Sequence, residues 1–183
     1  GPSHTLINDT LTGGWSGGVL APNGNIYCMP RESKANNVIL VINTTNDTVS
    51  KTLTTTGYGW QCGALAPNGK IYGFGATTIL IIDPDKNTAT TFGTISGAYW
   101  GSVLATNGKI YSIPFYTSTT QILEFDPVNN NITYFGTGII DANISNYLGG
   151  VLAPNGKIYG IPRDDSQVLE IIPYTQYGVN NYW

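Results

Sequence analysis

One sequence pattern occurs four times in this chain and predicts a fold built from repeats. The copies read WSGGVLAPNGNIY from Trp15, WQCGALAPNGKIY from Trp60, YWGSVLATNGKIY from Tyr99 and YLGGVLAPNGKIY from Tyr147. Successive Asn-Gly pairs, which begin at Asn23, Asn68, Asn107 and Asn155, are separated by 45, 39 and 48 residues. A period of this size is typical of one supersecondary unit that stacks on copies of itself.

Each copy predicts two short strands joined by a tight turn. The first strand, such as Gly18–Ala21, is rich in glycine, which suits an innermost position where backbones approach closely. The Asn-Gly pair predicts a type I′ hairpin turn, because these residues tolerate positive φ angles. The second strand, such as Lys70–Gly75, alternates, so that its isoleucine and its tyrosine lie on opposite faces.

An apolar third strand and a polar, threonine-rich fourth strand complete the unit. We expect the third strands at 38–42, 78–82, 121–125 and 167–171, and the fourth strands at 48–55, 88–93 and 131–136. Four-stranded antiparallel units that repeat at this period are typical of propeller blades. The predicted fold is therefore all-β, a four-bladed β-propeller with four antiparallel strands in each blade.

Residues 5–183 are expected to form this single propeller, after residues 1–4, which resemble the remnant of a cleaved tag. The blades are expected at 15–57, 58–97, 98–140 and 147–173, followed by a C-terminal tail at 174–183. Blade 4 has no polar fourth strand of its own. Residues 5–11 have a suitable length and are predicted to supply this outer strand, which would close the ring.

The composition argues against two classes of partner. The net charge is −3 and the eight Lys and Arg residues are spread singly, so we expect no nucleic acid partner. No apolar run reaches the roughly 18–20 residues that span a bilayer, so no membrane insertion is expected. Five Asn-x-Ser/Thr sequons are a weak indication of secretion. We expect an extracellular or particle-surface location rather than a cytoplasmic one.

Both cysteines occupy repeat positions where the other copies have small residues. Cys28 stands where the other copies have Gly73, Ser112 and Gly160, and Cys62 where they have Gly17, Gly101 and Gly149. Two buried free thiols are one interpretation, and a disulfide between neighbouring repeats is the other. Neither cysteine has the spacing of a metal ligand, and no metal site is predicted.

The loops before the first strand and after the second strand of each blade are expected to open on one face, around the central channel. They place a ring of aromatic side chains at the channel mouth: Trp15, Trp60, Tyr99, Trp100 and Tyr147. Such rings can stack on a sugar or hold a cation, or they can fill the gaps between neighbouring blades. Arg31, Tyr116 and Arg163, in the loops after the second strands, complete the predicted ligand-binding residues.

The pattern G-x-L-A-P-N-G-x-I-Y resembles the repeats of streptogramin-lyase-like and NHL-like propellers, over essentially the whole chain. The resemblance implies a propeller fold, usually with six or seven blades. Four blades could also be half of an eight-bladed ring assembled from two copies. Lyases of this type are expected to use a channel histidine, whereas the one histidine of this chain is His4. No Ser-His-Asp set is available either, so no catalytic residue is predicted.

These observations favour a non-enzymatic binding or interaction module that uses the channel-mouth face. A glycan is the most specific ligand expected there, and a protein is the alternative. A second reading is a structural, self-assembling unit of a virus particle or cell surface, and a third is a propeller-type lyase or hydrolase. No cofactor is expected, although backbone groups in the channel could hold an ion.

Overall fold

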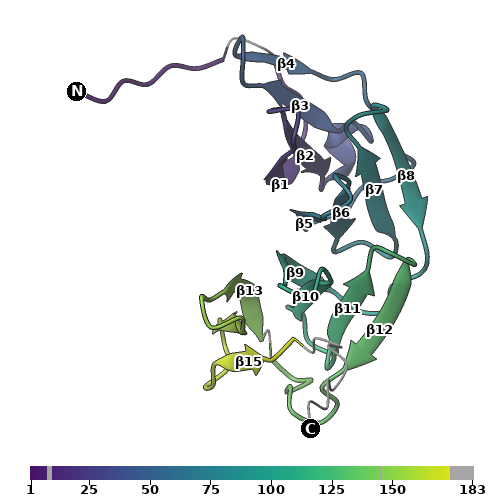
Figure 1. The fold of residues 1–183 in the computed structure, drawn as a ribbon, viewed down its shortest axis with the longest axis vertical. Coiled ribbons are helices and arrows are strands. Elements are labelled where there is room, and N and C mark those ends of the chain that lie inside the picture. Colours follow the sequence, from purple (N-terminus) through teal and green to yellow (C-terminus); the bar gives the residue numbers. More distant parts are fainter. Residues whose placement is uncertain (8–9, 145, 174–183) are drawn as a thin grey trace, which may run out of the picture.

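The protein consists of three four-stranded sheets and one three-stranded sheet, all antiparallel (Figure 1). The computed structural model describes residues 1–7, 10–144 and 146–173. The helical content of these residues is a single 3-10 turn, η1 (Ser33–Ala35). The predicted all-β class and the four propeller blades are therefore confirmed.

The strands follow the repeats in order. Blade 1 contains β1 (Trp15–Leu20), β2 (Ile26–Pro30), β3 (Leu40–Asn43) and β4 (Thr48–Ser50). Blade 2 contains β5 (Cys62–Leu65), β6 (Ile71–Phe74), β7 (Ile79–Asp83) and β8 (Thr88–Phe92). Blade 3 contains β9 (Tyr99–Leu104), β10 (Ile110–Pro114), β11 (Ile122–Asp126) and β12 (Asn131–Phe135). Blade 4 contains β13 (Tyr147–Leu152), β14 (Ile158–Pro162) and β15 (Leu169–Ile171). Figure 1 shows the blades side by side in an open arc, with the first strand of each on the concave side.

The predicted closure of the ring by the N-terminal segment is not formed. The described residues of segment 5–11 belong to no strand, and the sheet of blade 4 ends at β15. Figure 1 shows this segment beyond blade 1, at the opposite end of the arc from blade 4. Packing between neighbouring blades fixes the curvature of the arc, and at this curvature four blades leave the two ends apart. The predicted tail at 174–183 lies outside the described residues.

The hairpin between the first two strands of each blade differs from the predicted type I′ turn. The Gly24 amide donates to the Ala21 carbonyl oxygen at 2.9 Å, and Gly24 has a φ of +86°. Asn23 is not among the described residues with positive φ. The two strands are thus joined by a three-residue hairpin loop whose last residue is a left-handed glycine, which is a common connection. The other three blades repeat it at Gly69, Gly108 and Gly156.

The asparagine of this turn explains why a tyrosine recurs four residues later. In blade 2, Asn68 Nδ2 donates to the hydroxyl oxygen of Tyr72 at 2.9 Å, while Asn68 Oδ1 accepts the Lys70 amide at 3.0 Å. The same pair of bonds occurs at Asn23, Asn107 and Asn155. One side chain therefore fixes both the turn and the polar end of a largely buried aromatic ring.

We expect Asn68→Ala to destabilise the protein more than Tyr72→Phe does. The first change removes two hydrogen bonds and leaves the Tyr72 hydroxyl without this donor, whereas the second removes one bond and keeps the ring. At about 0.5–1.5 kcal/mol for each bond, the losses are about 1–3 and about 0.5–1.5 kcal/mol. Urea unfolding followed by circular dichroism measures both, and equal losses would contradict the role of the turn hydrogen bond.

The hydrophobic core lies between blades rather than within them. We call the side of a blade that faces the next blade in sequence its forward face, and the opposite side its rear face. Between blades 1 and 2, Tyr27, Met29 and Ile39 of the forward face pack on the rear-face residues Ile71, Leu80 and Ile82. The next two interfaces repeat this arrangement, with Tyr72 and Phe74 against Phe125, and Tyr111 and Ile113 against Ile158. The alternation predicted for the second strand is therefore correct, and it joins neighbouring blades.

Both cysteines are free thiols, Cys28 half-buried and Cys62 buried. The predicted alternative of a disulfide between repeats is therefore not formed. Burial raises the pKa of both thiols above the ordinary value, which keeps them in the neutral form. Within the described ranges, no helix is long and apolar enough to cross a membrane.

Candidate functional site

The start of the first strand and the end of the second strand lie at the same edge of each blade, because the two strands are antiparallel. Trp15 pairs with Pro30 in blade 1, and Tyr147 pairs with Pro162 in blade 4. The loops that carry the predicted site residues therefore meet at this edge, which we call the channel mouth.

Three of the five predicted mouth aromatics are buried between blades. Trp60 and Tyr99 are each 1 % exposed, and Tyr147 is 3 % exposed. Their polar atoms are also occupied: the Trp60 indole N–H donates to the Thr78 carbonyl at 2.9 Å, and the Tyr99 hydroxyl donates to the Gln121 carbonyl at 3.2 Å. These side chains join the first strand of a blade to the approach of its third strand. They have no exposed ring face for a ligand, as the packing interpretation expects.

Trp15 occupies the corresponding place in blade 1 and is half-buried. Its indole N–H donates to the Val38 carbonyl oxygen at 2.8 Å. The repeat position therefore has one structural task in blades 1 to 3, which is to donate a hydrogen bond to a carbonyl just before the third strand. This task accounts for the restriction of the position to Trp and Tyr, the two aromatic residues that carry a strong donor.

Tyr147 differs from the others because its partner is charged. Its hydroxyl donates to Asp165 Oδ2 at 3.2 Å. Burial, together with the negative charge and the hydrogen bond of Asp165, raises the pKa of Tyr147 to about 12. Burial also raises the pKa of Tyr99 and that of Tyr111, whose hydroxyl additionally donates to Glu124.

We expect the protein to lose stability as the pH rises from 10 to 12. The unfolded chain releases the Tyr147 proton near pH 10, its ordinary pKa, whereas the folded protein retains it up to about pH 12. The unfolded state is therefore favoured progressively over this interval. Below pH 10 Tyr147 is protonated in both states, so its contribution to stability is fully present. Urea unfolding at pH 9 to 12 measures the slope. Tyr147→Phe should flatten it partly, since Tyr99 and Tyr111 still titrate, and an unchanged slope would contradict this assignment.

The other predicted site residues, Arg31, Trp100, Tyr116 and Arg163, come together around Phe115, which was not among them. We call these five residues the arginine–aromatic cluster. The guanidinium of Arg31 lies over the Trp100 ring, 5.0 Å from its centroid. The guanidinium of Arg163 lies over the Phe115 ring at 5.3 Å. Phe115 contacts both Trp100, at 4.7 Å between ring centroids, and Tyr116, at 5.3 Å. Side chains from blades 1, 3 and 4 thus meet at the mouth.

Backbone hydrogen bonds hold the two loops of blades 3 and 4 that build this cluster. The amide of the buried Asn146 donates to the Phe115 carbonyl at 3.0 Å, and the Asn146 carbonyl accepts the Arg163 amide at 2.9 Å. On the other side of the cluster, the amides of Arg31 and Glu32 both donate to the Gly14 carbonyl. The cluster therefore rests on a fixed backbone although its side chains are partly exposed.

The two arginines differ in their ionic partners. Arg163 lies 3.6 Å from Asp164, in a half-exposed pair. Arg31 makes no ion pair within the described part of the chain, because the neighbouring Glu32 binds Lys34 at 2.9 Å instead. Contact with Lys34 also lowers the pKa of Glu32, which remains ionised. The Arg31 guanidinium therefore has the Trp100 ring as its direct contact, while the nearby Glu32 carboxylate interacts with its charge without forming an ion pair.

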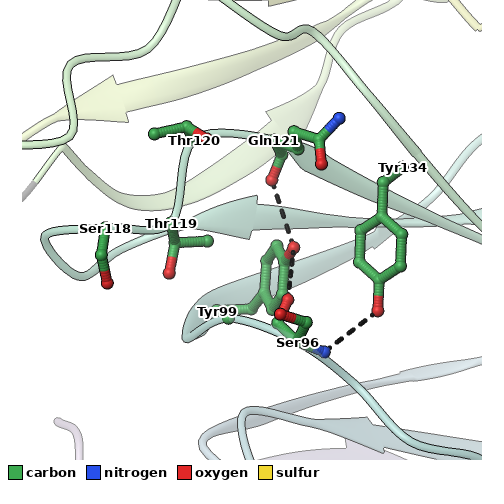
Figure 2. Close-up of a pocket in the computed structure, with 8 residues that line it drawn as sticks. Ser96, Tyr99, Ser118, Thr119, Thr120, Gln121 and Tyr134 are labelled. Atoms are coloured by element: carbon green, nitrogen blue, oxygen red, sulfur yellow. Dashed lines mark hydrogen bonds between the residues drawn. The ribbon is translucent and has the colours of Figure 1, made fainter.

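A pocket of about 280 Å³ lies beside the cluster, in blade 3 (Figure 2). Its lining is polar and carries no charged side chain: Ser96, Gly97, Tyr99, Ser118, Thr119, Thr120, Gln121 and Tyr134. Figure 2 shows the Tyr134 hydroxyl accepting the Ser96 amide, at 3.2 Å, and the Tyr99 hydroxyl bound to the Gln121 backbone. The loop 115–121 lines the pocket and also carries Phe115 and Tyr116 of the cluster.

Sequence reasoning did not identify this pocket or assign a role to Phe115. The pocket is built from serine and threonine residues of loops that differ between repeats, so the repeat pattern gives no signal for them. The length of the loop between β10 and β11, with the run Thr117–Thr120, is the one local indication. A hydrogen bond between the segment that leads into β9 and the outer strand β12, which the sequence does not encode locally, brings Ser96 and Tyr134 to the same place.

Acidic residues of the third strands serve structural pairs. Glu124 binds Lys109 at 3.0 Å and Glu170 binds Lys157 at 3.2 Å, each across neighbouring strands. Among the described residues, no group of three or more His, Cys, Asp or Glu side chains could hold a metal ion.

Comparisons with known proteins agree with the fold. No family model matches the chain, and no curated protein sequence matches it. Among solved structures, a virginiamycin B lyase from Staphylococcus aureus superimposes with a TM-score of 0.69 and 16 % identity, over 90 % of this chain and 53 % of that one. A streptogramin B lyase gives a TM-score of 0.70 at 16 % identity, over 94 % and 55 % of the two chains. The hydrazine synthase of Kuenenia stuttgartiensis gives 0.69 at 12 % identity, over 94 % and 49 %.

The resemblance to streptogramin-lyase-like propellers is therefore confirmed for the fold. At 12–16 % identity these likenesses show the architecture alone. The chain spans about half the length of the structures it matches. A histidine-to-alanine variant of the Staphylococcus aureus enzyme, solved with quinupristin, is described as catalytically inactive.

Proposed function

We propose that this protein is a non-enzymatic binding module and that its channel mouth binds an acidic glycan, one that carries a carboxylate or a sulfate group. The observation that carries the proposal is the position of Arg31, which lies on the face of Trp100 and makes no ion pair with the described residues. A guanidinium group in this state can bind two oxygen atoms of a carboxylate or sulfate group through two parallel hydrogen bonds.

Aromatic surfaces beside the arginines support a sugar as the body of the ligand. Tyr116 is exposed and Trp100 is half-exposed, and both adjoin the buried ring of Phe115. Such rings offer an apolar face to the C–H groups of a sugar, while the guanidinium groups bind its acidic substituent. Arg163 provides a second cation across Phe115, so the anion would bind between two positive groups.

The neutral pocket of blade 3 extends the same face. Its hydroxyl and amide groups suit a neighbouring sugar unit without charge, since hydroxyl groups act as both donors and acceptors. A ligand of two or more units would contact both the cluster and the pocket through the shared loop 115–121. Binding of this kind suits an extracellular or particle-surface protein.

A lyase reaction is the weaker alternative. The one histidine of the chain, His4, precedes all four blades, and no catalytic group is assigned to the mouth. Incubation with quinupristin, followed by mass spectrometry, tests this alternative directly. We expect quinupristin to remain unchanged, and its cleavage would overturn the non-enzymatic assignment.

A glycan array followed by calorimetry tests the binding proposal. We expect glycans with a carboxylate or sulfate to bind, their neutral parents to bind much more weakly, and added salt to reduce the affinity. Arg31→Ala should weaken binding by about 10-fold to 100-fold, the range for a lost hydrogen bond to a charged group. Lys86→Ala is the matched control, because it removes one positive charge from the turn between β7 and β8 and leaves the channel mouth unchanged. Equal effects of the two substitutions, or an array without acidic ligands, would contradict the proposal.

A further inference from the structure

The two ends of the arc each expose an apolar blade face. At one end, the forward face of blade 4 presents Val151, Ile161 and Val168, which are 59 %, 46 % and 60 % exposed. At the other end, the rear face of blade 1 presents Leu20, which is 60 % exposed, beside the half-buried Ile26 and Cys28.

Most of these residues belong to repeat positions that are buried wherever one blade meets the next, whereas the positions of Leu20 and Val151 are half-buried or buried there. Ile161 corresponds to Met29, Phe74 and Ile113, all 0 % exposed. Val168 likewise corresponds to Ile39, Ile79 and Ile122, and Ile26 to Ile71, Ile110 and Ile158, all at most 2 % exposed. The end faces are thus two halves of the interface that the chain forms three times internally, and each half lacks its complement.

The internal interfaces also show which residues would meet. In the interface between blades 1 and 2, a Cβ added at Gly63 would lie 2.5 Å from Met29 Cε, and one added at Gly73 would lie 3.0 Å from Met29 Sδ. In blade 1 these two positions are Gly18 and Cys28, which pair with each other across β1 and β2. A blade placed against the rear face of blade 1 would therefore direct its equivalent of Met29 at Gly18 and Cys28. In blade 4 that equivalent is Ile161.

Charge does not oppose this contact. The forward face of blade 4 carries the Lys157–Glu170 pair, and the forward face of blade 3 carries the equivalent Lys109–Glu124 pair while packed against blade 4. The exposed and half-buried residues of the rear face of blade 1 named above are uncharged. The paired charges would therefore lie at the margin of the new interface as they do in the existing one.

We propose that two copies of this chain join head to tail, with the forward face of blade 4 in each copy on the rear face of blade 1 in the other. The result is a closed, two-fold symmetric ring of eight blades, in which both exposed faces of both copies are covered. Two copies satisfy every such face with a single type of contact, as closed symmetric assemblies do. The ring also places two arginine–aromatic clusters on one face, whatever ligand they bind.

The mass in solution tests the assembly. Light scattering over a hundredfold range of concentration should give twice the 19.6 kDa of one chain. Leu20→Glu and Ile161→Glu, which alter partly exposed side chains on opposite end faces, should each yield folded monomers. Val128→Glu, at a position 92 % exposed in the turn between β11 and β12, is the matched control and should remain dimeric.

Each of the other outcomes overturns the proposal. If the wild-type protein is a monomer at all concentrations, the end faces would instead be covered by blades of another polypeptide or of a longer chain. Loss of the dimer in only one of the two glutamate variants would mean that the altered face binds the same face of the second copy, rather than the opposite end face.

A cross-link identifies the contact itself. Ile161→Cys should form a disulfide-linked, reducible dimer with the native Cys28 of the second copy under mild oxidation, and a dimer that resists reduction with a short bis-maleimide. Ile161→Cys combined with Cys28→Ser should remain uncrosslinked, because Cys62 is buried in blade 2. A cross-link that persists in the double variant, or a dimer that neither reagent links, would place the interface elsewhere.

Discussion

Trp60→Ala should lower the free energy of unfolding by about 3–5 kcal/mol, the range for truncation of a buried large aromatic side chain. Trp60 is 1 % exposed and packs between blades 1 and 2, in the layer that contains Met29 and Ile71. Its replacement leaves a cavity in that layer and removes the indole hydrogen bond to the Thr78 carbonyl. Because domains are stable by about 5–15 kcal/mol, a loss of this size is a large share of the total.

The matched control is Trp15→Ala, at the equivalent position of blade 1. Trp15 makes the same hydrogen bond, to Val38, but it is half-buried and no blade of the same chain lies behind it, so both variants are compared in the monomeric Ile161→Glu background. We therefore expect a distinctly smaller loss in urea unfolding. Similar losses for the two variants would show that the hydrogen bond, rather than the packing between blades, dominates the contribution of Trp60.

Gly101→Ala should be the most damaging of the glycine substitutions in the inner strands. A Cβ at Gly101 would lie 2.3 Å from the Cα of Gly149, in the inner strand of the next blade, and Gly101 has a φ of +103°. The contact is with backbone, which cannot rotate away, so β9 and β13 would have to separate. We expect a loss of about 1–2 kcal/mol from the backbone conformation and about 1–3 kcal/mol more from the overlap.

Gly108→Ala separates these two effects. Gly108 lies in the turn of the same blade and has a φ of +80°, but nothing lies within 4 Å of an added Cβ. It should show the conformational loss alone when both variants are unfolded in urea. Equal losses would mean that the close approach of the two inner strands contributes nothing.

The candidate site was predictable in part. The position of the loops followed from the repeat, since antiparallel strands place the start of the first and the end of the second at one edge. Arg31, Trp100, Tyr116 and Arg163 were therefore expected at the mouth, and the structure brings them together. Whether a given aromatic residue faces solvent or a neighbouring blade was not predictable. Trp60 and Trp100 are both tryptophans near a strand start, and only the packing of Trp60 against the preceding blade distinguishes them.

What the sequence determined by itself is the blade. Strand alternation, the Asn-Gly turn and the recurring tyrosine are local or nearly local features, and they specify hairpins whose two faces both require a neighbour. What only the tertiary structure decided is how the blades are arranged. The curvature of the arc arises from side chains that meet across blade interfaces, such as Met29 against Gly63, and from contacts between inner strands, such as Gly101 against Gly149. These contacts join residues about one repeat apart, so no local pattern records whether four blades close into a ring or leave two faces open.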